Sequence, residues 1–246
     1  MTQHLTTEIA ILGAGVAGLA IAEALIAEGR AEGEAGPATP GMGASYGNAG
    51  TIADYAVMPV GSPDVLRNLP SLMFDRNSPL SIRPAALPSL IPWLVRFAVQ
   101  SLPAATQRNA AAIAALVADA CPSWQALADR IGGTAILQQK GCLYLYETGA
   151  AFRAAEADMA YRRSLGISVE LIRPEALAAM EPGLPVVEGG AAYFPKAVFL
   201  SDPGAMMATL TQAVLAKAQF VQTATHKLTR QSDGVVVEGP GLRLRA

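Results

Sequence analysis

Three glycines near the start of the chain have the spacing of a phosphate-binding turn. Gly13, Gly15 and Gly18 form the pattern G-x-G-x-x-G directly after a short apolar run from Ile9 to Leu12, which has the length of a buried strand. In such a turn the first glycine permits a sharp bend, the second lets the backbone approach a phosphate, and the third lets the next helix pack against the strand. The chemistry indicated is the binding of a dinucleotide pyrophosphate.

The sequence also predicts the elements that must position this turn. Residues 16–27 are expected to form a helix whose unpaired N–H groups and positive dipole end point at the bound anion. The alternative is an ordinary strand, turn and helix in which the glycines are incidental, because a glycine pattern alone is weak evidence. The strand before the turn and the helix after it favour a nucleotide cofactor.

A second glycine-rich stretch follows a segment without strand character. Residues 30–40 (RAEGEAGPATP) contain one β-branched residue, Thr39, and no apolar alternation, so they predict a loop. The second strand expected in a nucleotide-binding layer is therefore missing from the pattern. Residues 41–55 (GMGASYGNAGTIADY) are small and glycine-rich, which suits a close approach of backbone to a ligand.

Composition narrows the class of protein. Apolar residues make up 52% of the 246 residues and charged residues 15%, which indicates a globular chain. A net charge of −2 does not favour binding to nucleic acid. No apolar run is expected to span a bilayer, and no secretory signal is expected. Two histidines, His4 and His226, leave little material for a metal site or a Ser-His triad. Cys121 and Cys142 match no metal or redox spacing and are expected to be core thiols.

The rest of the chain alternates predicted helices and strands. Helices are expected at 104–130, where Pro122 kinks or splits the helix, at 150–165, and at 205–218 after Asp202 and Pro203 as N-cap and first residue. Strands are expected at 141–148, 169–172, 190–195, 220–224, 234–238 and 242–245. This order predicts an α/β nucleotide-binding layer that is interrupted by an α+β insertion.

Taken together, these segments resemble the FAD-dependent D-amino-acid oxidase superfamily, and in particular its bacterial D-amino-acid dehydrogenase branch. The resemblance covers nearly the whole chain and depends on the order and spacing of seven motifs: ILGAGVAGLA, GASYGNAG at 43–50, SPLSIRP at 78–84, GCLYLYET at 141–148, RPEALAAMEPGL at 173–184, GAAYFP at 190–195 and SDPGAMMATL at 201–210. It implies a Rossmann-like FAD-binding layer (1–55), an inserted substrate or cap domain (56–195), and a return to the FAD-binding domain (196–246) that is incomplete at its C-terminal end.

The resemblance also implies roles for individual residues. The pyrophosphate of FAD would be cradled by Gly13, Ala14, Gly15, Val16, Ala17 and Gly18. The pyrophosphate and the flavin ring would be approached by Ser45, Asn48, Ala49 and Gly50. Thr225 matches a position whose backbone faces the adenine. For Ser45 and Asn48 the alternative is a loop turn that uses small polar residues, and Tyr55 is either a substrate-side residue or a packed tyrosine.

The sequence departs from the family pattern at two places. Relatives carry a second strand that ends in an acidic residue holding the adenosine ribose hydroxyls, and this position falls near Gly36, where only Glu32 and Glu34 are close. Our hypothesis for this segment is a local scrambling, such as a shifted reading frame restored at Pro40. Relatives also continue past position 246, so the sequence reads as an N-terminal portion. The basic residue that clamps the substrate carboxylate usually comes from the later part, and Arg76, Arg83 and Arg96 are expected to be solvated or structural.

The activity implied is the oxidation of D-amino acids or related amines by hydride transfer from Cα to flavin N5. The imino acid product would hydrolyse to a 2-oxo acid and ammonia. Expected partners are an amino-acid substrate and a quinone or other electron acceptor, at a cytoplasmic location or at the inner face of the plasma membrane. One alternative, an NAD(P)-dependent dehydrogenase, predicts a clear second strand ending in an acid or an arginine, which the sequence lacks. The other is an inactive remnant with weak or no flavin binding.

Overall fold

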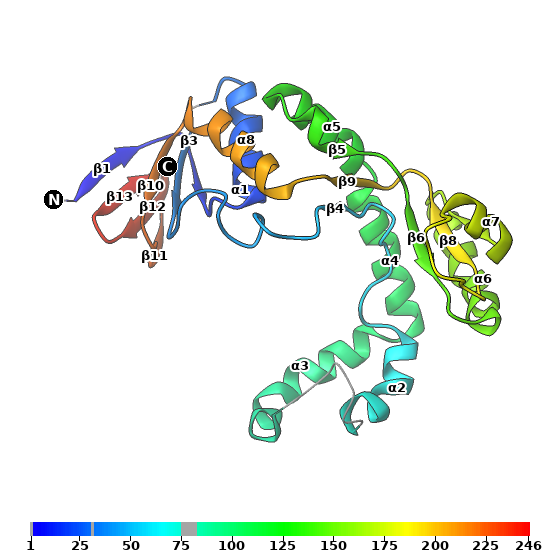
Figure 1. Cartoon of the computed structure of the whole chain (residues 1–246). Helices are drawn as coiled ribbons and strands as arrows, with labels where there is room; N and C mark the ends of the chain where they lie inside the picture. The colour runs from blue at the N-terminus through cyan, green and yellow to red at the C-terminus, as the bar shows by residue number, and fades with distance from the viewer. Residues whose placement is uncertain (1, 31, 75–82) are drawn as a thin grey trace. The chain divides into compact units, whose positions relative to one another are not determined.

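The computed structural model describes residues 2–30, 32–74 and 83–246. The chain divides into two compact units (Figure 1). Unit 1 comprises Met1–Ile52, Cys121–Lys140 and Val198–Ala246, and unit 2 comprises Ala53–Ala120 and Gly141–Ala197. The expected insertion at 56–195 includes residues 121–140, whereas the structure groups them with the glycine turn. Arg76 and most of the SPLSIRP motif lie outside the described residues.

A three-stranded parallel sheet forms the centre of unit 1. Its strands are β2 (Ile9–Leu12), β3 (Glu32–Gly36) and β10 (Gln219–Gln222), in the order β10-β3-β2. This is the 3-2-1 order of one half of a doubly wound nucleotide-binding sheet. The expected α/β fold class is therefore confirmed.

The prediction of a loop at residues 30–40 is wrong for Glu32–Gly36, because these residues form the central strand of this sheet. The register pairs Ile9 with Glu32 on one side and Phe220 with Glu34 on the other. Main-chain hydrogen bonds on both edges hold the strand despite its low β-propensity, since tertiary pairing overrides propensity. Its small residues also suit a tight layer: a Cβ at Gly33 would lie 3.3 Å from the Leu244 side chain.

A second sheet covers one face of the parallel sheet. It contains β1 (Gln3–Thr6), β11 (Lys227–Gln231), β12 (Gly234–Gly239) and β13 (Leu242–Arg245) in the order β1-β13-β12-β11. Val237, Leu242 and Leu244 pack with Ala35 of β3 in one buried cluster. The strands β1 and β11 were absent from the sequence prediction, since β1 lies in the short polar leader and β11 has little apolar alternation.

Helices cover the opposite face of the parallel sheet. They are α1 (Val16–Ala27), α8 (Pro203–Leu215) and α5 (Ala120–Ile131), and α1 and α8 lie side by side (Figure 1). Leu19, Leu210 and Leu127 join Ile11 of β2 in the buried core. Asp202 caps α8 as expected, because its Oδ1 accepts a hydrogen bond from the Ala205 N–H at 2.8 Å.

A small sheet in unit 1 connects distant parts of the chain. It consists of β4 (Thr51–Ile52), β9 (Val198–Leu200) and β5 (Leu137–Gln138), in the order β4-β9-β5, and β5 follows the 3-10 turn η2 (Thr134–Ile136). β9 pairs antiparallel with both neighbours. The second glycine-rich stretch is thus anchored beside the start of α8.

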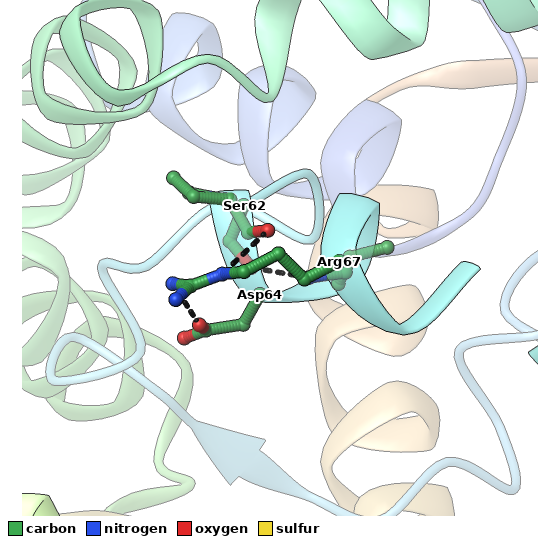
Figure 2. A network of polar contacts seen from close by, with 5 residues as sticks. Ser62, Asp64 and Arg67 are labelled. Carbon is green, nitrogen blue, oxygen red and sulfur yellow. Dashed lines mark hydrogen bonds and ion pairs between the residues drawn. The ribbon is translucent and has the colours of Figure 1, made fainter. Parts of the chain in front are cut away.

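Unit 2 combines a three-stranded antiparallel sheet with helices. The strands are β6 (Cys142–Leu145), β7 (Glu170–Ile172) and β8 (Ala191–Phe194), in the order β6-β8-β7. The helical elements are α2 (Pro63–Phe74), η1 (Pro84–Ala86), α3 (Leu87–Gln100), α4 (Pro103–Val117), α6 (Gly149–Ser164) and α7 (Pro174–Met180). Figure 2 shows the start of α2, where Ser62 Oγ accepts from the Val65 N–H at 3.3 Å and Arg67 pairs with Asp64 at 2.5 Å.

The long helix expected at 104–130 is split. α4 ends at Val117 and α5 begins at Ala120, so Pro122 lies in the first turn of α5, where a missing N–H costs little. An 18-residue window within the stretch Pro103–Ile131 has a mean hydropathy of 1.3, so by length and composition alone this stretch could cross a membrane. Core helices of soluble proteins pass the same test. The expectation that no segment has this property is therefore not confirmed.

Candidate functional site

The glycine turn joins β2 to α1 with the backbone geometry of an anion cradle. Gly13 has φ +110°, in the region that favours glycine, and its N–H donates to the Ala35 carbonyl of β3 at 2.8 Å. A Cβ at Gly18 would stand 1.8 Å from the Gly13 carbonyl oxygen. The pattern therefore has a physical basis at both positions, because neither would accept a side chain without moving the turn.

Ser45 lies at the start of α1. Its Oγ accepts a hydrogen bond from the Val16 N–H at 3.1 Å, so the hydroxyl itself lies among the unpaired N–H groups of the first helical turn. Gly15, the N-cap residue, has no side chain to cap the helix. The structure thus brings Ser45 to the N-terminal end of α1, although Ser45 lies 29 residues after Val16 in the sequence.

Asn48 makes side-chain hydrogen bonds within its own loop. Its Oδ1 accepts from the Gly50 N–H at 2.7 Å, and its Nδ2 donates to the Ser45 carbonyl at 3.4 Å. These bonds are those of the loop turn that formed the alternative interpretation. The side chain is exposed, as is that of the neighbouring Ala49.

Gly50 is buried and conformationally demanding. It has φ +66°, and a Cβ there would meet the Leu200 carbonyl at 2.8 Å and the Pro203 ring at 2.9 Å. Its own carbonyl accepts from the Leu200 N–H at 2.7 Å. The glycine therefore lets the loop pass directly against β9 and the first residue of α8.

Predicted and unpredicted residues meet at a cavity of about 70 Å³ in unit 1. The predicted residues in its wall are Val16, Ser45, Asn48 and Gly50; the others include Trp124, Leu200, Pro203 and Met207. The sequence predicted Pro203 as the first residue of a helix, but no pattern in the sequence indicated that Pro203 lies beside this loop. The cavity shows that the start of α1, which follows the glycine turn, lies beside the second glycine-rich stretch.

The remaining predicted residues lie around the turn. The Ala14 carbonyl accepts from the Gly41 N–H at 2.8 Å, which ties the second glycine-rich stretch to the first. Ala17 is exposed in the first turn of α1. Thr225 is half-buried in the segment after β10, and this segment adjoins the end of β3 because the Thr223 N–H donates to the Gly36 carbonyl at 2.8 Å.

Tyr55 is packed inside unit 2. Its side chain is 5% exposed and stacks on Phe194 with ring centroids 4.7 Å apart. Burial, followed by a hydrogen bond with Cys142, raises the pKa of the Tyr55 hydroxyl far above its ordinary value of 10.0. Its carbonyl accepts from Nη1 of the buried Arg162 at 3.0 Å. These contacts match the packed-tyrosine interpretation.

The sequence singles out three arginines in the first half of the insertion, and the structure describes two of them. Arg83 and Arg96 are exposed, as expected for solvated residues, and Arg76 lies outside the described residues. Among the residues that the structure describes, no three His, Cys, Asp or Glu side chains are placed to share a metal ion.

A comparison with protein families decides the class of protein. The model of the family described as "DAO: FAD dependent oxidoreductase" matches residues 8–246. The chain belongs to the DAO family. FAD is the cofactor of this family, and the glycine turn, the start of α1 and Ser45 fit the pyrophosphate of that cofactor, because backbone N–H groups and the Ser45 hydroxyl converge at the start of the helix.

Relatives within the DAO family include enzymes named for D-amino acids. The chain is 28% identical to a D-amino-acid oxidase of Bradyrhizobium diazoefficiens over 213 residues, which cover 85% of this chain and 50% of that protein. It is 31% identical to D-amino acid dehydrogenase 2 of Ralstonia nicotianae over 194 residues, which cover 76% of this chain and 45% of that protein. The chain therefore spans about half the length of these relatives.

Solved structures share the fold of this DAO-family chain. Glycine oxidase from Geobacillus kaustophilus superposes with a TM-score of 0.64 at 24% identity, over 98% of this chain and 54% of that one. L-amino acid deaminase from Proteus vulgaris, with its specific insertion sequence deleted, superposes with a TM-score of 0.67 at 11% identity, over 100% of this chain and 52% of that one. At these identities the likeness concerns the fold alone.

Proposed function

We propose that this chain forms the cofactor-binding and cap-forming portion of an enzyme that oxidises D-amino acids, or related amines, to imino acids. These products hydrolyse to 2-oxo acids and ammonia. The observation that carries the proposal is the glycine turn with Ser45 at its helix start, in a chain whose match to the DAO family runs from residue 8 to residue 246. Relatives named D-amino-acid oxidase and D-amino acid dehydrogenase favour this substrate class.

The protein's contribution to this chemistry is binding and orientation. When bound, FAD supplies the acceptor for the two electrons and the hydrogen that leave the substrate Cα. The first N–H groups of α1 and the Ser45 hydroxyl hold the negative charge of the pyrophosphate. Asn48 and Gly50 fix the loop that follows Ser45, through the 2.7 Å bond between them. We further propose a quinone or other acceptor for the electrons, and a cytoplasmic or membrane-peripheral location.

Reduction of bound flavin tests the proposed reaction. The purified chain is loaded with FAD, made anaerobic, and mixed with D-alanine, D-proline, glycine or sarcosine while the visible absorption of the flavin is followed. Bleaching by a D-amino acid, with the corresponding 2-oxo acid appearing in equal amount, supports the proposal. Saturating FAD that is bound but never bleached by any of the four would contradict an activity of this chain.

A second candidate is a non-catalytic chain that binds flavin weakly. The observation that favours it is Gly36 at the end of β3, where a nucleotide-binding strand usually supplies a carboxylate. The two candidates separate in the same experiment, because bleaching of the bound flavin by a D-amino acid fits the first candidate only.

A further inference from the structure

Gly36 ends the central strand β3 beside the glycine turn. Its carbonyl is held by the Thr223 N–H, and the preceding Ala35 carbonyl is held by the Gly13 N–H, both at 2.8 Å. A Cβ at Gly36 would lie 3.5 Å from the Ala14 nitrogen and 3.5 Å from the Phe220 ring, which is ordinary van der Waals contact. Its φ is not in the positive range. Position 36 therefore accepts a Cβ without strain, next to the first residues of the turn.

The end of this strand offers no charged group to a nucleotide. In dinucleotide-binding sheets a carboxylate here accepts hydrogen bonds from the ribose hydroxyls, whereas an arginine accommodates a ribose phosphate. From position 36 to position 53 the sequence contains no Asp, Glu, Lys, Arg or His. The segment therefore provides neither a carboxylate for a ribose diol nor a cation for a ribose phosphate.

Glu34 does not replace the missing acceptor. It lies two residues earlier on the same strand, so it shares the helix-facing side with position 36. Its side chain is fully buried, and its Oε1 lies 3.4 Å from the place where a Cβ of Gly18 would be. The carboxylate is therefore buried between β3 and α1, and it does not lie at the end of the strand, where a ribose would bind.

We propose that Gly36 sets the affinity and the ribose specificity of this nucleotide site. With glycine there, the chain holds its dinucleotide through the pyrophosphate and does not distinguish a ribose diol from a deoxyribose. A glutamate at position 36 restores both the affinity and the discrimination, because the added carboxylate accepts the ribose hydroxyls directly. This inference rests on the proposed FAD site.

Competition between two nucleotides tests the proposal without an activity assay. The purified chain and its Gly36→Glu, Gly36→Gln and Gly36→Ala variants are titrated with FAD, followed by flavin fluorescence, and FAD is then displaced by ADP or by 2′-deoxy-ADP. In the unaltered chain we expect the two competitors to bind with equal affinity within about twofold. In Gly36→Glu we expect ADP to bind about tenfold tighter than 2′-deoxy-ADP, as a charge-assisted hydrogen bond predicts.

The variants separate the added acceptor from the added bulk. Gly36→Ala adds the Cβ without an acceptor, so the ratio of the affinities for ADP and 2′-deoxy-ADP should stay near one. Gly36→Gln adds a neutral acceptor and should give an intermediate ratio. A ratio of about ten in the unaltered chain, or an unchanged ratio in Gly36→Glu, would overturn the inference while leaving the FAD site intact. Absence of any FAD or ADP binding in the unaltered chain would overturn the proposed site and this inference together. The unaltered chain's own ratio decides the matter even if a variant fails to fold.

Discussion

Gly18 lies directly against the backbone of Gly13: a Cβ at position 18 would stand 1.8 Å from the Gly13 carbonyl oxygen. This contact packs α1 against the turn that leaves β2 and keeps the first N–H groups of the helix beside that turn. The close approach of these two glycines, one with φ +110°, therefore sets how α1 meets the turn at which we propose that the pyrophosphate binds.

Replacing Gly18 by alanine should open the cradle. The overlap forces α1 away from the turn, so Gly18→Ala should lower the stability of unit 1 by about 1–3 kcal/mol and reduce FAD affinity by at least about tenfold. Thermal unfolding and flavin fluorescence titration measure the two effects. Gly183→Ala is the matched control, because a Cβ at Gly183 meets nothing within 4 Å. Equal affinity for FAD in both variants would contradict the role given to Gly18.

The pair of Arg130 and Glu23 should contribute more to stability than the exposed pairs of the same unit. Arg130 reaches Glu23 through two hydrogen bonds, at 2.8 and 2.6 Å, and the Glu23 side chain is only 10% exposed. Arg130→Ala leaves this carboxylate without its partner, which should cost about 2 kcal/mol. Arg30→Ala removes an exposed pair with Glu8 and should cost less than about 1 kcal/mol. Urea denaturation gives both values, and equal losses would refute the ranking.

Tyr55 should make unit 2 sensitive to alkali. In the unfolded chain its hydroxyl titrates near 10.0, and burial raises its pKa in the folded chain. The neutral phenol therefore stabilises the fold fully below pH 10.0, and this contribution is lost as the pH rises toward the folded pKa. Tyr144 and Tyr146, whose pKa values burial also raises, act in the same direction.

Tyr55→Phe separates the effect of the lost hydrogen bond from the effect of the titrating hydroxyl. At neutral pH the variant should be about 1 kcal/mol less stable, because it loses the hydrogen bond with Cys142. Above pH 10 the deficit should shrink, since phenylalanine has no proton to lose. Denaturation midpoints on both sides of pH 10 check this, and a deficit that is constant across the range would speak against a titrating Tyr55.

Asn48 should support the cofactor loop through its side-chain oxygen. Asn48→Ala removes the 2.7 Å bond to the Gly50 N–H and should weaken FAD binding by about three- to tenfold. Asn48→Asp keeps an acceptor for that N–H and should recover the thermal stability lost in Asn48→Ala. If alanine and aspartate lower the unfolding temperature equally, the bond to Gly50 does not hold the loop.

The sequence was most informative where local rules govern the backbone. The spacing of Gly13, Gly15 and Gly18 predicted the turn because each position has its own steric reason, and Asp202 predicted the start of α8 because an N-cap bond is local. The family resemblance then supplied Ser45, which lies far from the turn in sequence but bonds to Val16.

The sequence was least informative where distant pairing governs. Residues Glu32–Gly36 have the composition of a loop, and only their pairing with strands on both sides makes them the central strand. Trp124 and Met207 reach the cavity beside Ser45 through the packing of α5 and α8, which no local pattern records. The family pattern already pointed to position 36 for the ribose-binding acid, but only the structure shows that Gly36 ends a central strand beside the turn.

Titration of the purified chain with FAD, with ADP as competitor, tests the central claim most directly. If the turn at Gly13–Gly18 holds the pyrophosphate of a dinucleotide, flavin fluorescence should change to saturation, ADP should reverse the change, and Gly18→Ala should shift the titration to at least about tenfold higher FAD concentration. Flavin fluorescence that does not respond to the chain, or a response that ADP leaves untouched, would contradict the account.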